Sequence, residues 1–99
     1  MEIKIQAINF EAGEKLQDYV QKRVGKLARF CAEIKNAEVV LKVVKPETAA
    51  NKEGSIRLVL PGGELYAQKV ADTFEETVDL CADTLTRQLE KYKEKQKNR

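Results

Sequence analysis

The chain has 99 residues, of which 42% are hydrophobic and 34% are charged, and its formal net charge is +2. A chain of this length supports one small core, so we expect a single domain over residues 1–99. The composition excludes a disordered chain. No apolar run is long enough to span a membrane, and the N-terminus lacks the apolar centre of a signal peptide. We therefore expect a cytoplasmic protein with no membrane partner.

Few residues of this chain are suited to catalysis or metal binding. The sequence contains no histidine, the commonest general base and metal ligand at neutral pH. It also lacks a nucleophile motif and a phosphate-binding loop. Cys31 and Cys81 match no metal or redox spacing, so we expect them to be buried as small apolar residues. The sequence predicts a protein that is not an enzyme and that uses no cofactor, metal ion or small-molecule substrate.

The first half of the chain predicts a strand, a helix and a second strand. Apolar and polar residues alternate over residues 3–7, which is typical of a strand with one buried face. Apolar residues then recur at spacings of three and four over residues 16–31, which predicts an amphipathic helix. Residues 37–44 are rich in β-branched side chains and predict a second strand. Residues 45–54 have the composition of a polar loop.

The second half begins with two strands joined by a tight turn. Residues 55–60 alternate as a third strand, Pro61-Gly62-Gly63 can adopt the dihedral angles of a hairpin turn, and residues 64–70 form the returning strand. With a final helix, the order is β-α-β-β-β-α. Two one-sided helices can cover one face of a four-stranded sheet, so the sequence predicts an α+β fold built as a two-layer sandwich.

The final helix has a capping motif at its start and a polar segment at its end. Thr73 followed by Glu76 forms a capping box, in which side chains bind free N–H groups of the first turn. Apolar residues then recur at helical spacing as far as Tyr92. Residues 95–99 have no apolar stripe to bury, so we expect them to fray.

Basic residues of the first predicted helix gather opposite its apolar stripe. At about 100° per residue, one narrow sector of the helix holds several of them. They are Lys15, Lys22, Lys26 and Arg29, with Arg23 on the flank of the sector. This arrangement places a basic surface away from the core.

The second predicted helix is acidic in its first half and basic in its second half. Arg87, Lys91 and Lys95 are spaced by four and therefore share one face. Because acids at the start and bases at the end of a helix also complement its dipole, a merely solvated surface remains an alternative. If the two helices lie side by side, their basic rows can merge into one field that suits nucleic-acid phosphates.

Aromatic residues give little support for sequence-specific base readout. Tyr19, Phe30 and Tyr66 could stack on bases, but residues in such positions more often form the edge of a core. No ribonucleoprotein-type aromatic motif occurs on a predicted strand. The pattern favours recognition of the shape and backbone of folded RNA.

Several segments together resemble the ribosome hibernation promoting factor family, also called ribosome-associated inhibitors or sigma-54 modulation proteins. The clearest lies in the last helix, where Asp79, Asp83 and Leu85 precede Arg87-Gln88-Leu89 and a series of alternating lysines. The other matching segments are Lys26-Leu27, residues 38–43, and Gly62-Gly63-Glu64-Leu65 with Ala67. Their order and spacing cover nearly the whole chain.

The resemblance implies a fold like the double-stranded RNA-binding domain with an added first strand. It implies binding to 16S rRNA of the small ribosomal subunit, in the channel between head and body, and inhibition of translation under stress or in stationary phase. It further implies eight RNA-binding residues: Lys22, Arg23, Lys26, Arg29, Arg87, Lys91, Lys93 and Lys95. Lys22, Arg23 and Arg29 are assigned by position more than by motif.

Two further expectations follow from the resemblance. Long members carry an additional C-terminal domain that pairs ribosomes, and because this sequence ends at Arg99 we expect a short form without it. One family name also keeps an alternative open, a protein-interaction module that modulates a transcription (sigma) factor. Such a module would bind through apolar anchors more than through lysine rows.

Overall fold

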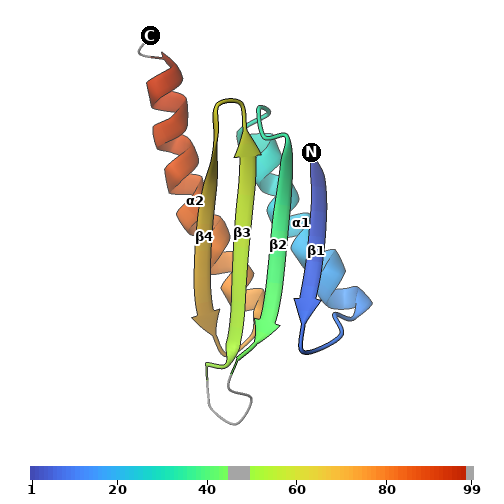
Figure 1. Cartoon of the computed structure of the whole chain (residues 1–99). Helices are drawn as coiled ribbons and strands as arrows, with labels where there is room; N and C mark the ends of the chain where they lie inside the picture. The colour runs from blue at the N-terminus through green and yellow to red at the C-terminus, as the bar shows by residue number, and fades with distance from the viewer. Residues whose placement is uncertain (45–49, 98–99) are drawn as a thin grey trace.

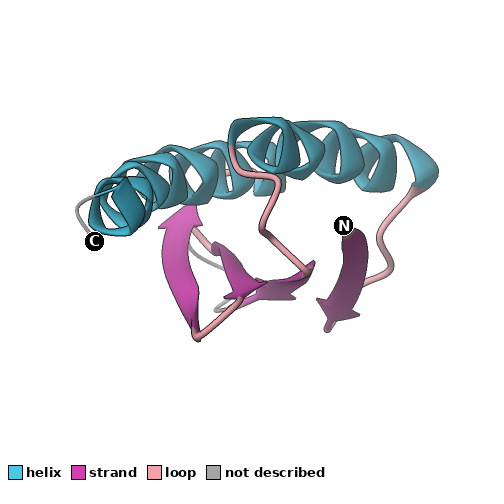
Figure 2. Ribbon diagram, turned by 90° about the horizontal axis from the view of Figure 1, so that it is seen from above, coloured by secondary structure: helices cyan, strands magenta, loops and turns pink. Residues whose placement is uncertain are grey.

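The protein is a four-stranded sheet covered on one face by two helices, as Figures 1 and 2 show. The computed structural model describes residues 1–44 and 50–97, with side chains as far as Lys95. The elements are β1 (Glu2–Ile8), α1 (Glu14–Phe30), β2 (Asn36–Val43), β3 (Lys52–Leu60), β4 (Gly63–Ala71) and α2 (Phe74–Lys97). The predicted α+β class and β-α-β-β-β-α order are confirmed.

The strands lie in the order β1-β2-β3-β4. β1 pairs with β2 in parallel, and the other two pairings are antiparallel. A parallel pair needs a crossover connection, which α1 supplies. Both helices run in the same general direction behind the sheet (Figure 1), and α1 packs against α2. Their outer surfaces therefore share one side of the molecule.

The core lies between the helices and the inner face of the sheet. Alternate strand residues point into it, and the helices contribute their apolar stripes. Its largest fully buried members include Leu27, Leu41, Ile56, Leu58, Leu85 and Leu89. Cys31 and Cys81 are buried and unpaired, as the sequence predicts.

Two element boundaries differ from the predictions by three residues, and the others differ by at most two. β3 begins at Lys52, so residues 52–54 of the predicted loop are strand, because β3 pairs along its whole length with β4 from Lys52↔Ala71 to Leu60↔Gly63. Residues 45–49 of that loop lie outside the described residues.

The expected fraying from residue 95 is wrong as far as Lys97, where α2 ends. This segment consists of Lys and Gln, which are both good helix formers. The helix therefore extends past the end of the sheet (Figure 1). Asn98 and Arg99 lie outside the described residues.

Candidate nucleic-acid interface

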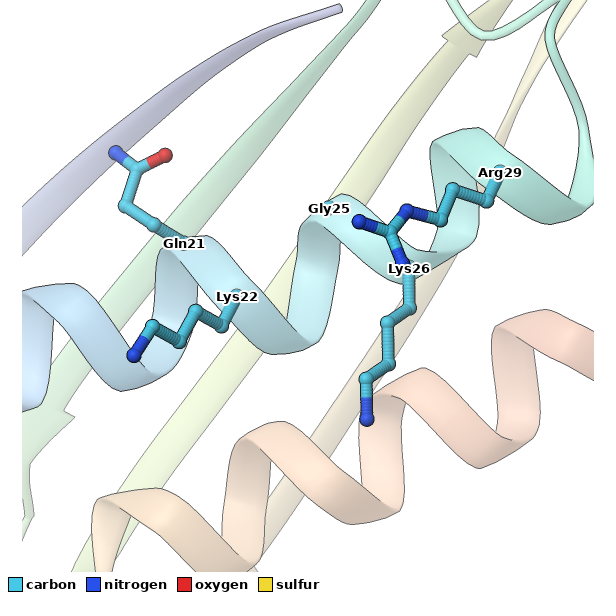
Figure 3. Close-up of a pocket in the computed structure, with 5 residues that line it drawn as sticks. All are labelled: Gln21, Lys22, Gly25, Lys26 and Arg29. Carbon is cyan, nitrogen blue, oxygen red and sulfur yellow. The ribbon is translucent and has the colours of Figure 1, made fainter.

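The outward face of α1 carries three exposed basic residues around a glycine. Lys22, Lys26 and Arg29, together with Gln21 and Gly25, line a shallow hollow (Figure 3). Gly25 has no side chain to fill it, while the Lys26 side chain extends toward α2. We call Lys22, Lys26 and Arg29 the α1 patch. Three positive charges within two turns form a surface that attracts phosphate groups.

Arg23 does not share that surface, because its guanidinium faces α2. Its Nε donates to Asp79 Oδ1 at 3.0 Å and its Nη2 donates to Asp83 Oδ1 at 2.9 Å. The Tyr19 hydroxyl donates to the same Asp79 carboxylate, with both oxygens at 2.7 Å. This hydrogen bond is the main cause that raises the pKa of Tyr19 above its ordinary value. Tyr19, Arg23, Asp79 and Asp83 form what we call the interhelix cluster.

Lys93 also joins the two helices. Its Nζ donates to the carbonyl oxygen of Phe30 at 3.0 Å and lies 4.6 Å from the centroid of the Phe30 ring. Phe30 is the last residue of α1, where a positive charge complements the free carbonyls and the dipole of the helix. The ammonium group of Lys93 is thereby held at the interhelix contact.

The remaining basic residues of α2 lie elsewhere on that helix. Lys91 and Lys95, with Leu65 and Tyr92, line a second hollow beside β4. We call Lys91 and Lys95 the α2 patch. Arg87 is exposed on α2. The α2 patch and the α1 patch are thus on opposite sides of the seam between the helices.

The predicted RNA-binding residues are therefore divided into groups. Three form the α1 patch, two form the α2 patch, Arg87 is exposed nearby, and Arg23 and Lys93 make contacts between the helices. The helices do lie side by side, but the hollow between them is lined by Asp79 and Asp83 as well as by lysines. The two basic rows consequently do not form a field free of carboxylates.

Sequence reasoning missed the partners of Arg23, although a signal was present. Tyr19 and Arg23 are four residues apart on α1, and Asp79 and Asp83 are four apart on α2. Each pair therefore shares one face of its helix. Reading the two pairs as complementary would have placed them across one interhelix contact.

The uncovered face of the sheet differs from the helical face. Arg57 forms ion pairs there with Glu38 at 3.4 Å and Glu64 at 3.8 Å, and it lies over the Tyr66 ring at 5.9 Å. The expectation that Tyr66 forms a core edge is wrong, since it is 48% exposed on β4. It occupies an outward position in the alternation of that strand. Acidic and basic residues alternate here, so this face is less suited to phosphate.

The described residues offer little chemistry of other kinds. Among them, no group of three or more His, Cys, Asp or Glu side chains is placed to hold a metal ion. Within the same residues, no helix has the length and apolar character needed to cross a membrane. Burial raises the pKa of the Cys81 thiol to about 11, so this thiol is protonated at neutral pH.

Fold and surface together define a small α+β protein with exposed basic groups on two parallel helices. The sequence profile of the family described as "Sigma 54 modulation protein / S30EA ribosomal protein" matches residues 3–97, and the chain belongs to this family. A ribosome hibernation promoting factor from Pseudomonas putida is 32% identical over 98 residues, which cover 99% of this chain and 92% of that protein.

Two solved structures share the fold. A ribosomal subunit interface protein from Coxiella burnetii matches with a TM-score of 0.84 and 27% identity, covering 94% of this chain and 98% of the other. The N-terminal domain of Protein Y from Thermus thermophilus matches with a TM-score of 0.79 and 25% identity, covering 93% and 99%.

Proposed function

We propose that this protein is a cytoplasmic ribosome hibernation factor that binds the small ribosomal subunit and inhibits translation under stress or in stationary phase. The observation that carries the proposal is the α1 patch, in which the exposed residues Lys22, Lys26 and Arg29 line one hollow whose described lining contains no carboxylate. Membership of the family and the names of the relatives support a ribosomal partner.

The proposed mechanism is occlusion and requires no catalysis. The helical face would contact 16S rRNA phosphates in the channel between the head and the body of the subunit. Messenger and transfer RNA occupy that channel during translation, so a bound domain would exclude them. In this proposal Lys22, Lys26, Arg29, Arg87, Lys91 and Lys95 contact phosphates directly.

Phosphate contacts predict how the affinity for the ribosomal subunit depends on salt concentration. Each ammonium or guanidinium group that neutralises a phosphate releases condensed counterions, so affinity falls steeply as salt rises. Recognition of shape and backbone also predicts that binding depends on folded rRNA rather than on a short sequence. A protein that bound a sigma factor through apolar anchors would show a weaker dependence on salt.

The test is co-sedimentation of the purified protein with purified small and large ribosomal subunits at increasing salt. We expect it to pellet with the small subunit at low salt, to be released at high salt, and to compete with messenger RNA bound beforehand. A parallel translation reaction should slow as the protein is added. If the protein stays in the supernatant at low salt, the proposal is wrong. Capture of a protein partner that survives RNase treatment would favour the sigma-factor alternative.

A further inference from the structure

Arg23 forms ion pairs within the interhelix cluster, whereas its basic neighbours on α1 are exposed. Two of its nitrogens donate to Asp79 and Asp83 at 3.0 and 2.9 Å, and its side chain is only 24% exposed. Lys22 and Lys26, one residue before and three residues after it, are exposed. We propose that Arg23 is a positioning residue of the RNA-binding surface and does not contact RNA, an inference that rests on the proposed function.

Charge in the cluster opposes a phosphate contact at Arg23. One guanidinium faces two carboxylates, which leaves these three side chains with a net charge of −1. The carboxylates are also the more exposed partners, with Asp79 43% and Asp83 66% exposed. A phosphate approaching Arg23 would therefore meet two negative groups that already hold its donors. Lys22 and Lys26 of the α1 patch line the same hollow as these carboxylates, but within the described part of the chain neither lysine forms an ion pair with them.

The position of the cluster explains what Arg23 does instead. Tyr19 and Arg23 join the middle of α1 to the first half of α2, and Lys93 joins the end of α1 to the second half of α2. Two separate points of contact fix both the spacing and the angle of the helices. They thereby fix the α1 patch relative to the α2 patch. Phosphates on folded RNA also have fixed spacing, so the two patches must be held in register to bind together.

The experiment compares Arg23 with Lys22, its neighbour on the α1 patch. Binding to purified small subunits is measured over a range of salt for wild type, Arg23→Gln and Lys22→Gln, and thermal unfolding is measured for each. Lys22→Gln should reduce the slope of log affinity against log salt by about one and leave the unfolding temperature unchanged. Arg23→Gln should lower the unfolding temperature and the affinity while the slope stays at the wild-type value.

Two more variants keep the test decisive if Arg23→Gln folds poorly. Tyr19→Phe removes only a hydroxyl from the cluster and should weaken binding slightly without changing the salt slope. The exchange Arg23→Asp with Asp79→Arg restores opposite charges across the helices and should recover affinity that Arg23→Asp alone loses. A salt slope that falls by about one in Arg23→Gln, with unchanged unfolding, would overturn the inference.

Failure of this inference is distinguishable from failure of the proposed function. If wild type binds small subunits and Lys22→Gln flattens the salt slope, the proposed function stands whatever Arg23→Gln does. An exchange variant that binds no better than Arg23→Asp alone would count against the positioning role only. If wild type does not bind at low salt, the proposed function itself fails.

Discussion

At the scale of single residues, Gly54 is a position where α2 approaches the sheet closely. A Cβ atom at Gly54 would lie 2.8 Å from Thr77 Cβ and closer still to Thr77 Oγ1. Thr77 is fully buried and its hydroxyl donates to the Phe74 carbonyl at 2.7 Å, so it has little room to move. We expect Gly54→Ala to lower the free energy of unfolding by about 1–3 kcal/mol, measured by urea denaturation.

Gly63 provides the matched control, because a Cβ atom there meets no atom within 4 Å. Gly63→Ala should change the free energy of unfolding by less than about 0.5 kcal/mol. Equal stability of the two alanine variants would show that helix α2 does not approach β3 as the structure describes.

The Cys81 thiol makes stability depend on alkaline pH. It is fully buried, its Sγ lies 3.4 Å from the Gly54 carbonyl oxygen, and burial raises its pKa from 9.0 to about 11. The folded protein therefore keeps a proton that the unfolded chain releases above pH 9. The resulting stabilisation, about 2–3 kcal/mol at most, is present below pH 9 and is lost as the pH rises toward 11.

Urea denaturation of wild type and Cys81→Ala at pH values from 7 to 10.5 measures this effect. Cys81→Ala leaves every other side chain of the protein in place, so the difference between the two curves isolates the thiol. The difference in free energy of unfolding should be constant below about pH 8.5 and should shrink above it. A difference that stays constant to pH 10.5 would contradict the raised pKa.

Patterns in the sequence predicted which residues are buried better than they predicted which side chains contact each other. Cys31 and Cys81 were predicted to be buried because free cysteine behaves as a small apolar residue, and both are. Arg23 was grouped with the basic sector of its helix, since a helical projection gives its direction but not what faces it. Its partners lie 56 and 60 residues away, which no local pattern encodes.

At the scale of elements, the start of α2 depends on one hydroxyl. Thr73 Oγ1 accepts a hydrogen bond from the Glu76 backbone N–H at 3.1 Å, which satisfies a donor that the helix itself leaves free. Thr73→Ala should lower the free energy of unfolding by about 1 kcal/mol, measured by urea denaturation. Thr73→Ser keeps the acceptor oxygen and should retain most of that stability.

The same substitution inside the helix serves as a comparison. Thr84 lies in the body of α2, where alanine has the higher helix propensity, so Thr84→Ala should hold or gain stability. If both alanine variants lost the same amount, the effect at Thr73 would not arise from capping.

Element order followed from the sequence because periodicity changes between strands and helices, and capping and turn residues mark several of the boundaries. The ends that differed depend on neighbouring strands or on the charged tail of a helix. β3 is longer than its apolar alternation because β4 supplies pairing partners as far as Ala71. α2 is longer than its apolar stripe because good helix formers continue it past the core.

At the scale of the whole molecule, charge is distributed differently on the two faces. The helical face carries the α1 patch and the α2 patch, whereas ion pairs on the open sheet face hold Arg57 to Glu38 and Glu64. The two-layer arrangement was predictable from two one-sided helices and one alternating sheet. The division of the basic residues was not, because it depends on how α1 packs against α2.

These two faces allow the proposed RNA-binding surface to be tested with two variants of equal net charge. Lys22→Gln with Lys26→Gln removes two charges from the α1 patch. Lys4→Gln with Lys42→Gln removes two from strands β1 and β2, where these lysines line hollows of the open sheet face. Each double variant lowers the formal net charge from +2 to 0. General attraction between a basic protein and RNA would therefore weaken both variants equally.

Contact through the helical face predicts unequal results. The α1-patch variant should bind small subunits more weakly, and its log–log salt slope should fall by about two, one for each lysine that no longer neutralises a phosphate. The sheet-face variant should bind nearly as wild type, since its lysines would lie away from the RNA. Because all four lysines lie outside the buried core, thermal unfolding should be similar in all three proteins. Equal weakening of the two variants would show that net charge, and not the placement of α1 over the sheet, governs binding.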